Sequence, residues 1–439
     1  MRINNHTLST VSLNWTEYDR AILAVKALLN NSIEGAKEEQ FKPGSKTILQ
    51  SVYERFEYMK LFNVSGQEFI DKAVWDLYDA CTQLEISVNA SGTNLNDSLA
   101  TKETRYLYMN LQKIVKKRLI FGMHDTTGYG VGWSGNDNRS DIKDVCGDFP
   151  AIFSEDIFRV ELDDQVERMR YRLTEAYNSG SIITMCWHQF DPDFRGPYFV
   201  NVKGKRVVST LLPGGSRHEE YKVKLFNIAK FLKSLRGKNG ESIPVIFRPY
   251  HEHTSHTFWW GTLSTSKEEF NRIWQFTQEY LRDSLNVHSL IYALSPIMPD
   301  VASGESYFNR YPGDKYVDIF GADYYFKRFN IPFYTKRKFL KGLQTIAKHS
   351  IARNKVTALT EIGNTNLKTT GWFKSILKIL KYDCLASNFV YAVVWRNASK
   401  KHHFAPYPGH CSVKDFMDFY HDSYTVFQHD LPNMYTFPK

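Results

Sequence analysis

The spacing of apolar positions divides the chain into two parts. Between about residues 13 and 90, apolar side chains recur every three or four positions, which is the period of amphipathic helices. Helices of this kind bury their apolar stripes against one another, so we predict a small all-α three-helix bundle, preceded by a flexible polar segment at 1–12. The stripes are Tyr18, Ile22, Val25, Leu28 and Leu29; Ile48, Val52, Phe56, Met59 and Leu61; and Phe69, Ala73, Leu77 and Leu84.

The second part begins after residues 91–103, which are rich in Asn, Ser, Gly and Thr and are predicted to be a linker. From there, short apolar runs of strand length alternate with helical patterns, which predicts an α/β fold. The eight predicted strands are 119–124, 151–158, 182–188, 244–250, 290–294, 317–324, 356–360 and 389–395. The clearer helices are at about 163–178, 217–236, 266–284, 335–349, 371–381 and 412–421.

Eight strand–helix units within residues 104–439 are typical of a (β/α)8, or TIM, barrel. A doubly wound open sheet is the alternative, but the Gly-rich phosphate-binding pattern that follows its first strand is missing here. Functional side chains of such barrels lie at the carboxyl ends of the strands. Those ends carry many polar and indole side chains here: His124 and Asp125; Trp187 and His188; His251 and Glu252; Asp323, Tyr324 and Tyr325; Glu361; and Trp395, Arg396 and Asn397.

The most informative stretch is FRPYHEHTSHTFWWG at 247–261. It places the charged Glu252 at the end of a buried strand, close to Trp259 and Trp260, an arrangement that folding alone does not favour. One interpretation is an ordinary strand end with tryptophans that pack in the core. Another is carbohydrate chemistry, because indole faces bind pyranose rings and an apolar wall raises the pKa of a glutamate, which can then act as a general acid.

A zinc site is a third interpretation of the same stretch. His251 and His256 are five positions apart, whereas the helical zinc motif requires histidines four apart on one face. The five cysteines contain no Cys-x-x-Cys pair that would suggest a metal or redox site. We therefore expect neither a metal nor a cofactor.

Glycoside cleavage requires a second carboxylate. The best candidate is Glu361 in VTALTEIG at 356–363, where a buried strand again leads to a carboxylate. Arg248 lies on the strand that leads to Glu252. It is expected to pair with a carboxylate at this end of the barrel, a bidentate role for which arginine is suited.

Four motifs in this order resemble glycoside hydrolase family 26, whose best-known members are β-mannanases. They are FGMHDTTGYGVGW at 121–133, RPYHEH and FWWG within 248–261, TEIG at 360–363 and WRNA at 395–398. The resemblance covers roughly the last three quarters of the chain. It implies a retaining endo-β-1,4-mannosidase that cleaves mannan or galactomannan by double displacement.

The resemblance also implies roles for individual residues. Glu252 matches the acid/base of the family and Glu361 its nucleophile. The family usually has a tryptophan directly before FWWG, where this chain has Thr257, and the loss of an indole surface changes one sugar subsite. Further residues expected to bind or orient the sugar are Arg248, His188, Trp187, His251, Trp259, Trp260, Tyr325 and Trp395.

Composition adds limits to this picture. The net charge of +9 is spread over the chain, which is typical of solvated helix faces, and no nucleic-acid-binding motif accompanies it. No membrane span is visible, and the first thirty residues lack the apolar core of a signal peptide. Either the protein is cytoplasmic or the numbering starts after a removed signal, and the family resemblance favours the second. The resemblance thus implies a protein that meets its polysaccharide substrate outside the cell, at the cell surface or in the periplasm, and we expect it to be a monomer.

Two questions stay open at this level. The FKPGS turn and the three-helix layout of the first part resemble small FIVAR-type modules, but a structural spacer or brace without a ligand is the better explanation of the bundle. The alternatives to a mannanase are a related β-glycanase acting on xylan or mixed-linkage glucan, and a catalytically silent glycan-binding protein. Retention of both glutamates argues against the silent protein.

Overall fold

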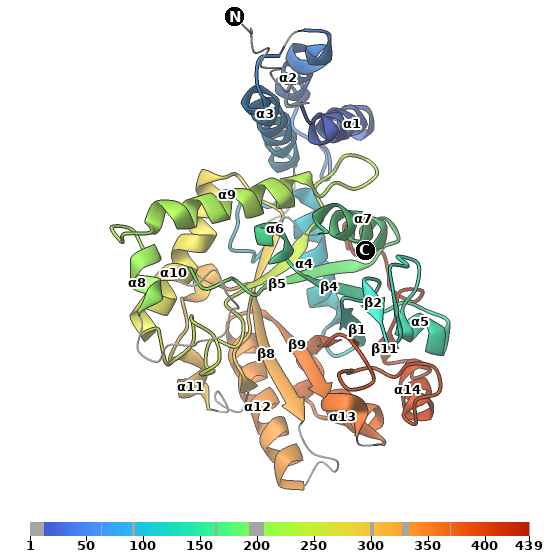
Figure 1. Ribbon diagram of the computed structural model, residues 1–439. Helices are drawn as coiled ribbons and strands as arrows, with labels where there is room; N and C mark the ends of the chain where they lie inside the picture. The colour runs from blue at the N-terminus through green and yellow to red at the C-terminus, as the bar shows by residue number, and fades with distance from the viewer. Residues whose placement is uncertain are drawn as a thin grey trace, which may run out of the picture. The chain divides into compact units, whose positions relative to one another are not determined.

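The chain forms two compact units in the computed structural model, Met1–Asn89 with Lys238–Glu241, and Ala90–Gly237 with Ser242–Lys439 (Figure 1). The predicted flexible segment at 1–12 lies outside the described residues. The structure describes residues 13–62, 64–89, 93–162, 165–192, 206–298, 303–326, 333–368 and 370–438.

The first unit contains the three expected helices, α1 (Thr16–Asn31), α2 (Lys46–Phe56) and α3 (Gln67–Ile86). Both α1 and α2 pack against α3. The stripe predicted for α1 is buried at Tyr18 and Val25. The apolar stripes of the three helices therefore form a core within this unit.

The stripe predicted for the second helix is wrong by one position. The structure buries Leu49 and Tyr53, whereas Ile48 is 56% exposed. A shift of one residue turns the buried face of a helix by about 100°. The pattern Ile48–Val52–Phe56 has the same period, so the sequence alone did not distinguish the two faces.

The second unit is a closed barrel of eight parallel strands, which confirms the predicted (β/α)8 fold (Figure 1). Neighbouring strands pair in chain order, and β10 pairs with β1 to close the barrel. The strands are β1 (Leu119–His124), β4 (Ile152–Asp156), β5 (Ile182–Trp187), β6 (Val245–Pro249), β7 (Leu290–Leu294), β8 (Ile319–Phe326), β9 (Val356–Asn364) and β10 (Phe389–Val394).

Helices between the strands surround this barrel (Figure 1). None of the helices in the described part of the chain is long and apolar enough to span a lipid bilayer. The helices of this unit, including α4 before the first strand and α14 after β10, are α4 (Lys102–Ile114), α5 (Asp141–Cys146), α6 (Arg159–Leu162), α7 (Val166–Asn178), α8 (Val207–Leu211), α9 (His218–Ser234), α10 (Lys267–Glu279), α11 (Gly304–Phe308), α12 (Phe333–Ala352), α13 (Trp372–Tyr382) and α14 (Val413–Tyr420). Short strands are β2 (Tyr129–Gly130), β3 (Trp133–Ser134) and β11 (Thr425–Val426).

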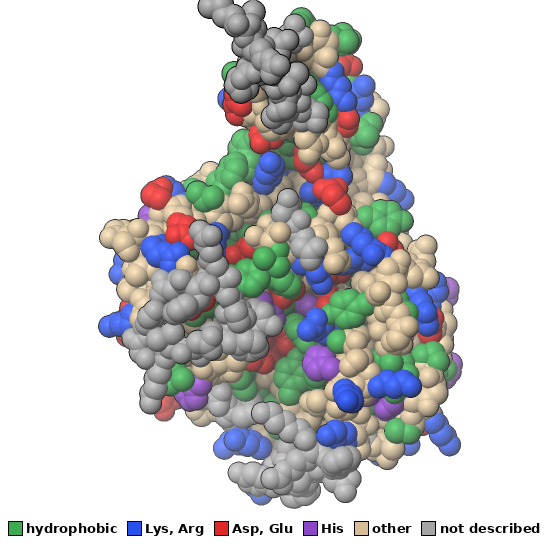
Figure 2. Space-filling view, viewed as in Figure 1, with side chains coloured by type: hydrophobic (Ala, Val, Ile, Leu, Met, Phe, Trp, Pro, Cys, Tyr) green, Lys and Arg blue, Asp and Glu red, His purple; other side chains and the backbone are tan. Residues whose placement is uncertain are grey.

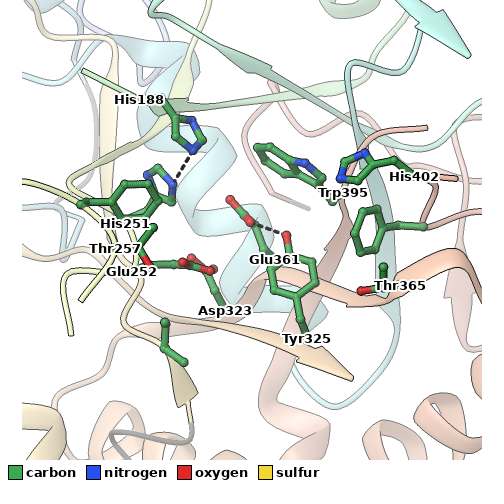
Figure 3. Close-up of a pocket in the computed structure, with 13 residues that line it drawn as sticks. His188, His251, Glu252, Thr257, Asp323, Tyr325, Glu361, Thr365, Trp395 and His402 are labelled. Carbon is green, nitrogen blue, oxygen red and sulfur yellow. Dashed lines mark hydrogen bonds between the residues drawn. The ribbon is translucent and has the colours of Figure 1, made fainter. Parts of the chain in front are cut away.

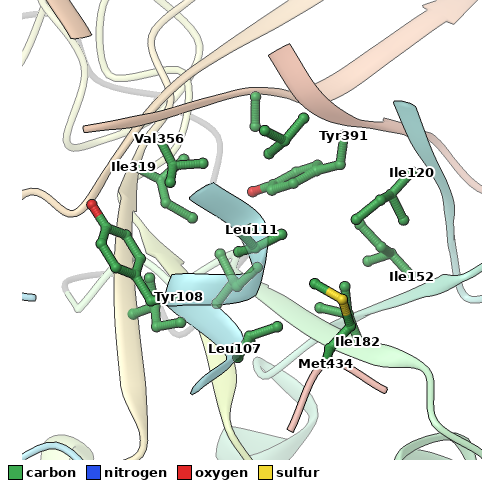
Figure 4. Close-up of a cluster of buried hydrophobic side chains, with 14 of the residues drawn as sticks. Leu107, Tyr108, Leu111, Ile120, Ile152, Ile182, Ile319, Val356, Tyr391 and Met434 are labelled. Atoms are coloured by element: carbon green, nitrogen blue, oxygen red, sulfur yellow. The ribbon is translucent and has the colours of Figure 1, made fainter. Parts of the chain in front are cut away.

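Helix α4 closes the amino end of the barrel. Its residues Leu107 and Leu111 belong to a buried cluster to which all eight barrel strands contribute, among them Ile120 of β1 and Ile152 of β4 (Figure 4). A packed apolar core at this end leaves the carboxyl end of the strands for a site, as is usual for this fold.

Part of the predicted linker at 91–103 belongs to the same core. Leu95 and Ala100 are buried in the cluster around α4. The backbone N–H of Asn96 donates to the Asp318 carboxylate at 2.9 Å. From Leu95 onward, this segment is therefore packed structure rather than a solvated connection.

Strand β9 is longer than predicted. The apolar run was expected to end at Thr360, but β9 continues to Asn364. Its register against β8 shifts between the pairs Ala322–Leu359 and Asp323–Glu361, which leaves Thr360 as an extra residue. Such a β-bulge changes the direction of the side chains around it, so Glu361 is presented from within the strand rather than from its end.

Candidate active site

A cavity of about 520 Å³ opens at the carboxyl ends of the barrel strands. Figure 2 shows acidic and histidine side chains together in a hollow on this face of the barrel. Its volume lies within the range of small-ligand sites. Six of the residues predicted from the sequence line it: His188, His251, Glu252, Tyr325, Glu361 and Trp395 (Figure 3).

Three carboxyl groups meet in this cavity. One oxygen of each of Glu252, Asp323 and Glu361 lies within 4.8 Å of the others. Burial raises the pKa of Asp323 well above its usual value, and the neighbouring Glu361 raises it further, against the opposing effect of Arg248. The like-charge repulsion within this group thus favours the protonated form of Asp323.

Glu361 is held by two donors. An Arg248 guanidinium nitrogen donates to its Oε1 at 2.7 Å, and the Tyr325 hydroxyl donates to its Oε2 at 2.5 Å. Burial and then the Glu361 charge raise the pKa of Tyr325 well above 10, so the phenol keeps its proton and remains a donor. With both oxygens bound, the carboxylate has a fixed orientation in the cavity (Figure 3).

Glu252 is presented by a strained backbone. Its φ angle is 49°, and that of Tyr250, two residues earlier, is 55°, both in the left-handed region that non-glycine residues rarely adopt. The Glu252 N–H donates to the Ser295 carbonyl at 2.7 Å, and the Ser255 N–H donates to the Glu252 carbonyl at 2.8 Å. Surrounding contacts of this kind are needed to keep such a conformation, which costs on the order of 1 kcal/mol or more per residue.

A row of hydrogen bonds supports the histidines. Nδ1 of His188 lies 2.5 Å from the Asp156 carboxylate, and its Nε2 lies 3.0 Å from Nε2 of His251. Burial, with a further contribution from His188, lowers the pKa of His251 well below 6.5. His251 is therefore neutral near neutral pH, and the row fixes the orientation of both rings at the cavity wall.

Trp395 forms another part of the wall. Its ring stacks on His124 with centroids 4.0 Å apart and planes at 20°. The indole is half-buried and lines the cavity beside His402 (Figure 3). One face is thus covered by the protein, which leaves the rest of the indole available to a ligand.

Three predicted sugar-binding tryptophans do not reach the cavity. Trp187, Trp259 and Trp260 are each at most 1% exposed. Their indole N–H groups donate within the fold, from Trp187 to Glu161, from Trp259 to the Gln189 carbonyl and from Trp260 to the His251 carbonyl. They support the site from behind, so the prediction of direct sugar contact does not fit their burial.

The sequence interpretation missed several lining residues. Ile297, Thr365, His402 and Phe404 also line the cavity. His402 and Phe404 belong to the segment between β10 and α14 rather than to the end of a strand. Loop residues leave no periodic signal in a sequence, even though loops often carry binding residues.

Two groups of side chains have the donor types of metal sites. In each, the donor atoms lie within 4.8 Å of one another: Glu252 with Asp323 and Glu361, and His124 with Asp156 and Cys186. Members of both groups are already bound within the protein, since Glu361 pairs with Arg248 and Asp156 with His188. These contacts give the groups partners that do not involve a metal.

His253 is a buried imidazole behind the site, and it leads to a prediction about stability. Its ring stacks on Phe270 at 4.3 Å, and burial followed by the Arg310 charge lowers its pKa well below 6.5. The unfolded chain therefore binds one more proton as pH falls below about 6.5, and the free energy of unfolding decreases in that window. In His253→Leu, we expect this decrease to be smaller by about 1.4 kcal/mol per pH unit at most. Urea unfolding at several pH values between about 7.5 and 5 measures the free energy of unfolding of both proteins. The same dependence of this free energy on pH in the wild type and in His253→Leu would contradict the expectation.

The fold and the site together define a class of protein. A closed parallel barrel with carboxylates converging at the carboxyl ends of its strands is the architecture of many barrel enzymes, and paired carboxylates are the groups that cleave glycosidic bonds. The sequence profile of glycosyl hydrolase family 26 matches residues 96–426, and the chain belongs to this family.

Solved structures agree with this assignment. A GH26 beta-mannanase from Bacteroides ovatus is 34% identical, with a TM-score of 0.72 over 76% of this chain and 98% of that one. An endo-beta-1,4-mannanase from Cellulomonas fimi is 30% identical, with a TM-score of 0.73 over 78% of this chain and 79% of that one.

Among curated proteins, a mannan endo-1,4-beta-mannosidase from Bifidobacterium adolescentis is 29% identical over 334 residues, which are 70% of this chain. The matched region is 32% of that relative, and 64% of a mannan endo-1,4-beta-mannosidase from Bacillus subtilis that is 24% identical. The chain thus spans only part of the length of these relatives.

Proposed function

We propose that this protein is a retaining glycoside hydrolase that cleaves internal β-1,4-mannosidic bonds of mannan or galactomannan. The observation that carries the proposal is the separation of two carboxylates, because oxygens of Glu252 and Glu361 lie within 4.8 Å of each other. Retaining enzymes have carboxyl groups about 5–5.5 Å apart, whereas inverting enzymes need about 6.5–9.5 Å to admit a water.

In the proposed first step, Glu361 attacks the anomeric carbon while Glu252 protonates the oxygen of the departing sugar. The carbon–oxygen bond to the leaving group breaks, and an ester bond to Glu361 forms. In the second step, Glu252 removes a proton from water, whose oxygen attacks the same carbon and releases Glu361. The configuration is inverted twice and so retained.

The surroundings of the two glutamates support this division of roles. The nucleophile must be oriented as a carboxylate, and Glu361 accepts hydrogen bonds on both oxygens from Arg248 and Tyr325. The acid/base must face the leaving group and water, and Glu252 lies on the loop after β6, partly exposed at the cavity. His188, His251 and Trp395 form the wall at which we place the sugar ring.

The choice of mannan rests on the relatives, whose names specify mannan as their substrate. An enzyme encounters a polysaccharide such as mannan outside the cytoplasm, so we also propose an extracellular, cell-surface or periplasmic location. The two glutamates and the protein donors around them suffice for the chemistry, which requires no cofactor.

Parallel digestion of linear mannan, galactomannan, xylan and mixed-linkage glucan tests the proposal. We expect a ladder of short mannooligosaccharides from linear mannan, because internal cleavage produces a spread of sizes. A single short product would indicate attack from the chain end. Cleavage of xylan or glucan alone would overturn the mannan assignment, and no cleavage of any of the four would overturn the enzymatic one.

A further inference from the structure

Arg310 is a buried arginine next to the loop that carries Glu252. Only 6% of it is exposed. One guanidinium nitrogen donates to the Thr265 carbonyl at 2.7 Å and another to the Trp260 carbonyl at 3.0 Å. The guanidinium also stacks on the Phe270 ring, 4.8 Å from its centroid.

The partners of this arginine are unusual for a buried cation. Within the part of the chain that the structure describes, no carboxylate lies at ion-pair distance from Arg310, and its contacts are backbone carbonyls and an aromatic face. Burial lowers its pKa to about 10, so it is charged at neutral pH. Burying a charge without a carboxylate partner costs free energy. The hydrogen bonds that Arg310 makes in this position bind two backbone carbonyls of the 250–265 loop.

From those carbonyls a short path leads to Glu252. The indole N–H of Trp260 donates to the His251 carbonyl at 2.8 Å, directly before Glu252. The Trp260 ring lies flat on Phe258, with centroids 4.5 Å apart and planes at 7°, and Phe258 lines the cavity. Arg310 fixes Trp260, and Trp260 fixes the peptide that places Glu252 in its left-handed conformation.

We infer that Arg310 is a positioning residue for the acid/base Glu252, acting through Trp260 and the backbone of the 250–265 loop. The inference rests on the proposed function, because it presupposes the role of Glu252. Arg310 does not line the cavity, yet on this inference it determines the orientation of the proton donor. Lysine at this position would keep the charge but lose the planar fork that binds two carbonyls at once.

The test compares kcat/KM for two substrates in Arg310→Lys and Arg310→Ala. On mannan, whose leaving sugar requires protonation, we expect a loss of up to about 100-fold, the effect of a catalytic group displaced by about 1 Å. On a dinitrophenyl β-mannoside, whose leaving group departs without a proton, we expect less than about a threefold change. Guanidinium ion at millimolar concentration should restore part of the loss in Arg310→Ala, and sodium chloride of equal ionic strength should not.

Three further variants make the outcome decisive. Trp260→Phe keeps an aromatic ring but removes the N–H that donates to the His251 carbonyl. It should therefore lose activity on mannan but not on the dinitrophenyl β-mannoside, even if Arg310→Ala fails to fold. Arg353→Ala, which removes an arginine stacked on Phe308 at 4.4 Å elsewhere in the barrel, should show no such difference between the two substrates. Suppose that Glu252→Ala lowers kcat/KM on mannan but not on the dinitrophenyl β-mannoside. If the Arg310 and Trp260 variants then lose activity on both substrates equally, Arg310 is only structural. If Glu252→Ala itself shows no such difference, the proposed role of Glu252 fails instead.

Discussion

Replacing Glu361 by alanine is expected to lower kcat on mannan by about ten-thousand-fold or more, while mannooligosaccharide binding persists. The proposed nucleophile forms the covalent intermediate, and without it the two-step route is closed. Binding should persist because the cavity walls formed by His188 and Trp395 are unchanged. Steady-state kinetics and calorimetric titration with a short mannooligosaccharide measure the two quantities separately.

Azide provides a sharper readout for the same variant. In Glu361→Ala, azide fits the space left by the carboxylate and attacks from the face opposite the leaving group. With a dinitrophenyl β-mannoside, the expected product is an α-mannosyl azide of inverted configuration. Turnover of mannan at the wild-type rate would show that Glu361 is not the nucleophile, and a β-configured azide would show that another carboxylate still acts in its place.

The barrel was predictable because its strands are buried on both faces. Such strands appear as continuous apolar runs, and each of the eight predicted runs overlaps a strand of the barrel. The approximate location of the carboxylates followed from the fold, since carboxyl ends of parallel strands share one rim. The bulge at Thr360 did not follow, because it depends on the register between β8 and β9 rather than on the composition of either strand.

The tryptophans show a different limit. The sequence places Trp259 and Trp260 beside Glu252 but does not reveal which face of an indole is covered. In the structure, both rings pack against other aromatic side chains, including each other at 5.3 Å, and their N–H groups find carbonyl partners. Trp395 remains half-buried because its neighbour His124 covers only one side. Residue type and spacing predicted a sugar-binding role for all three tryptophans. Only their tertiary contacts distinguish the buried Trp259 and Trp260 from Trp395, which lines the cavity.

Arg248 pairs with carboxyl groups that are far from it in the sequence, so these contacts depend on the fold. It donates to Glu361 at 2.7 Å and lies 3.5 Å from Asp323, although these residues are 113 and 75 positions away. Burial lowers its pKa, but the charges of Glu361 and Asp323 outweigh that effect and raise it. The guanidinium of Arg248 on β6 thus contacts carboxyl groups of β8 and β9. The same contacts stabilise the barrel at this end and orient the proposed nucleophile.

Replacing Glu252 by alanine should affect substrates differently, according to how much protonation their leaving groups require. We expect kcat/KM on mannan to fall by about 100- to 10,000-fold, the usual contribution of general acid catalysis. For a dinitrophenyl β-mannoside, kcat/KM should stay within a few-fold of wild type, because this ratio reports the first step, which needs no acid here. Its kcat should fall, since the second step loses its base and the glycosyl-enzyme accumulates.

The pH dependence and azide add two independent checks on Glu252. In the wild type, kcat/KM on mannan should decline at high pH as the acid loses its proton, and in Glu252→Ala this decline should disappear. Azide should accelerate release of the intermediate and give a β-mannosyl azide, the configuration opposite to that expected for Glu361→Ala. The two variants thus differ in product stereochemistry as well as in rate, so a general loss of folding cannot imitate either result. If both variants gave the same azide anomer, the assignment of separate roles to the two glutamates would be wrong.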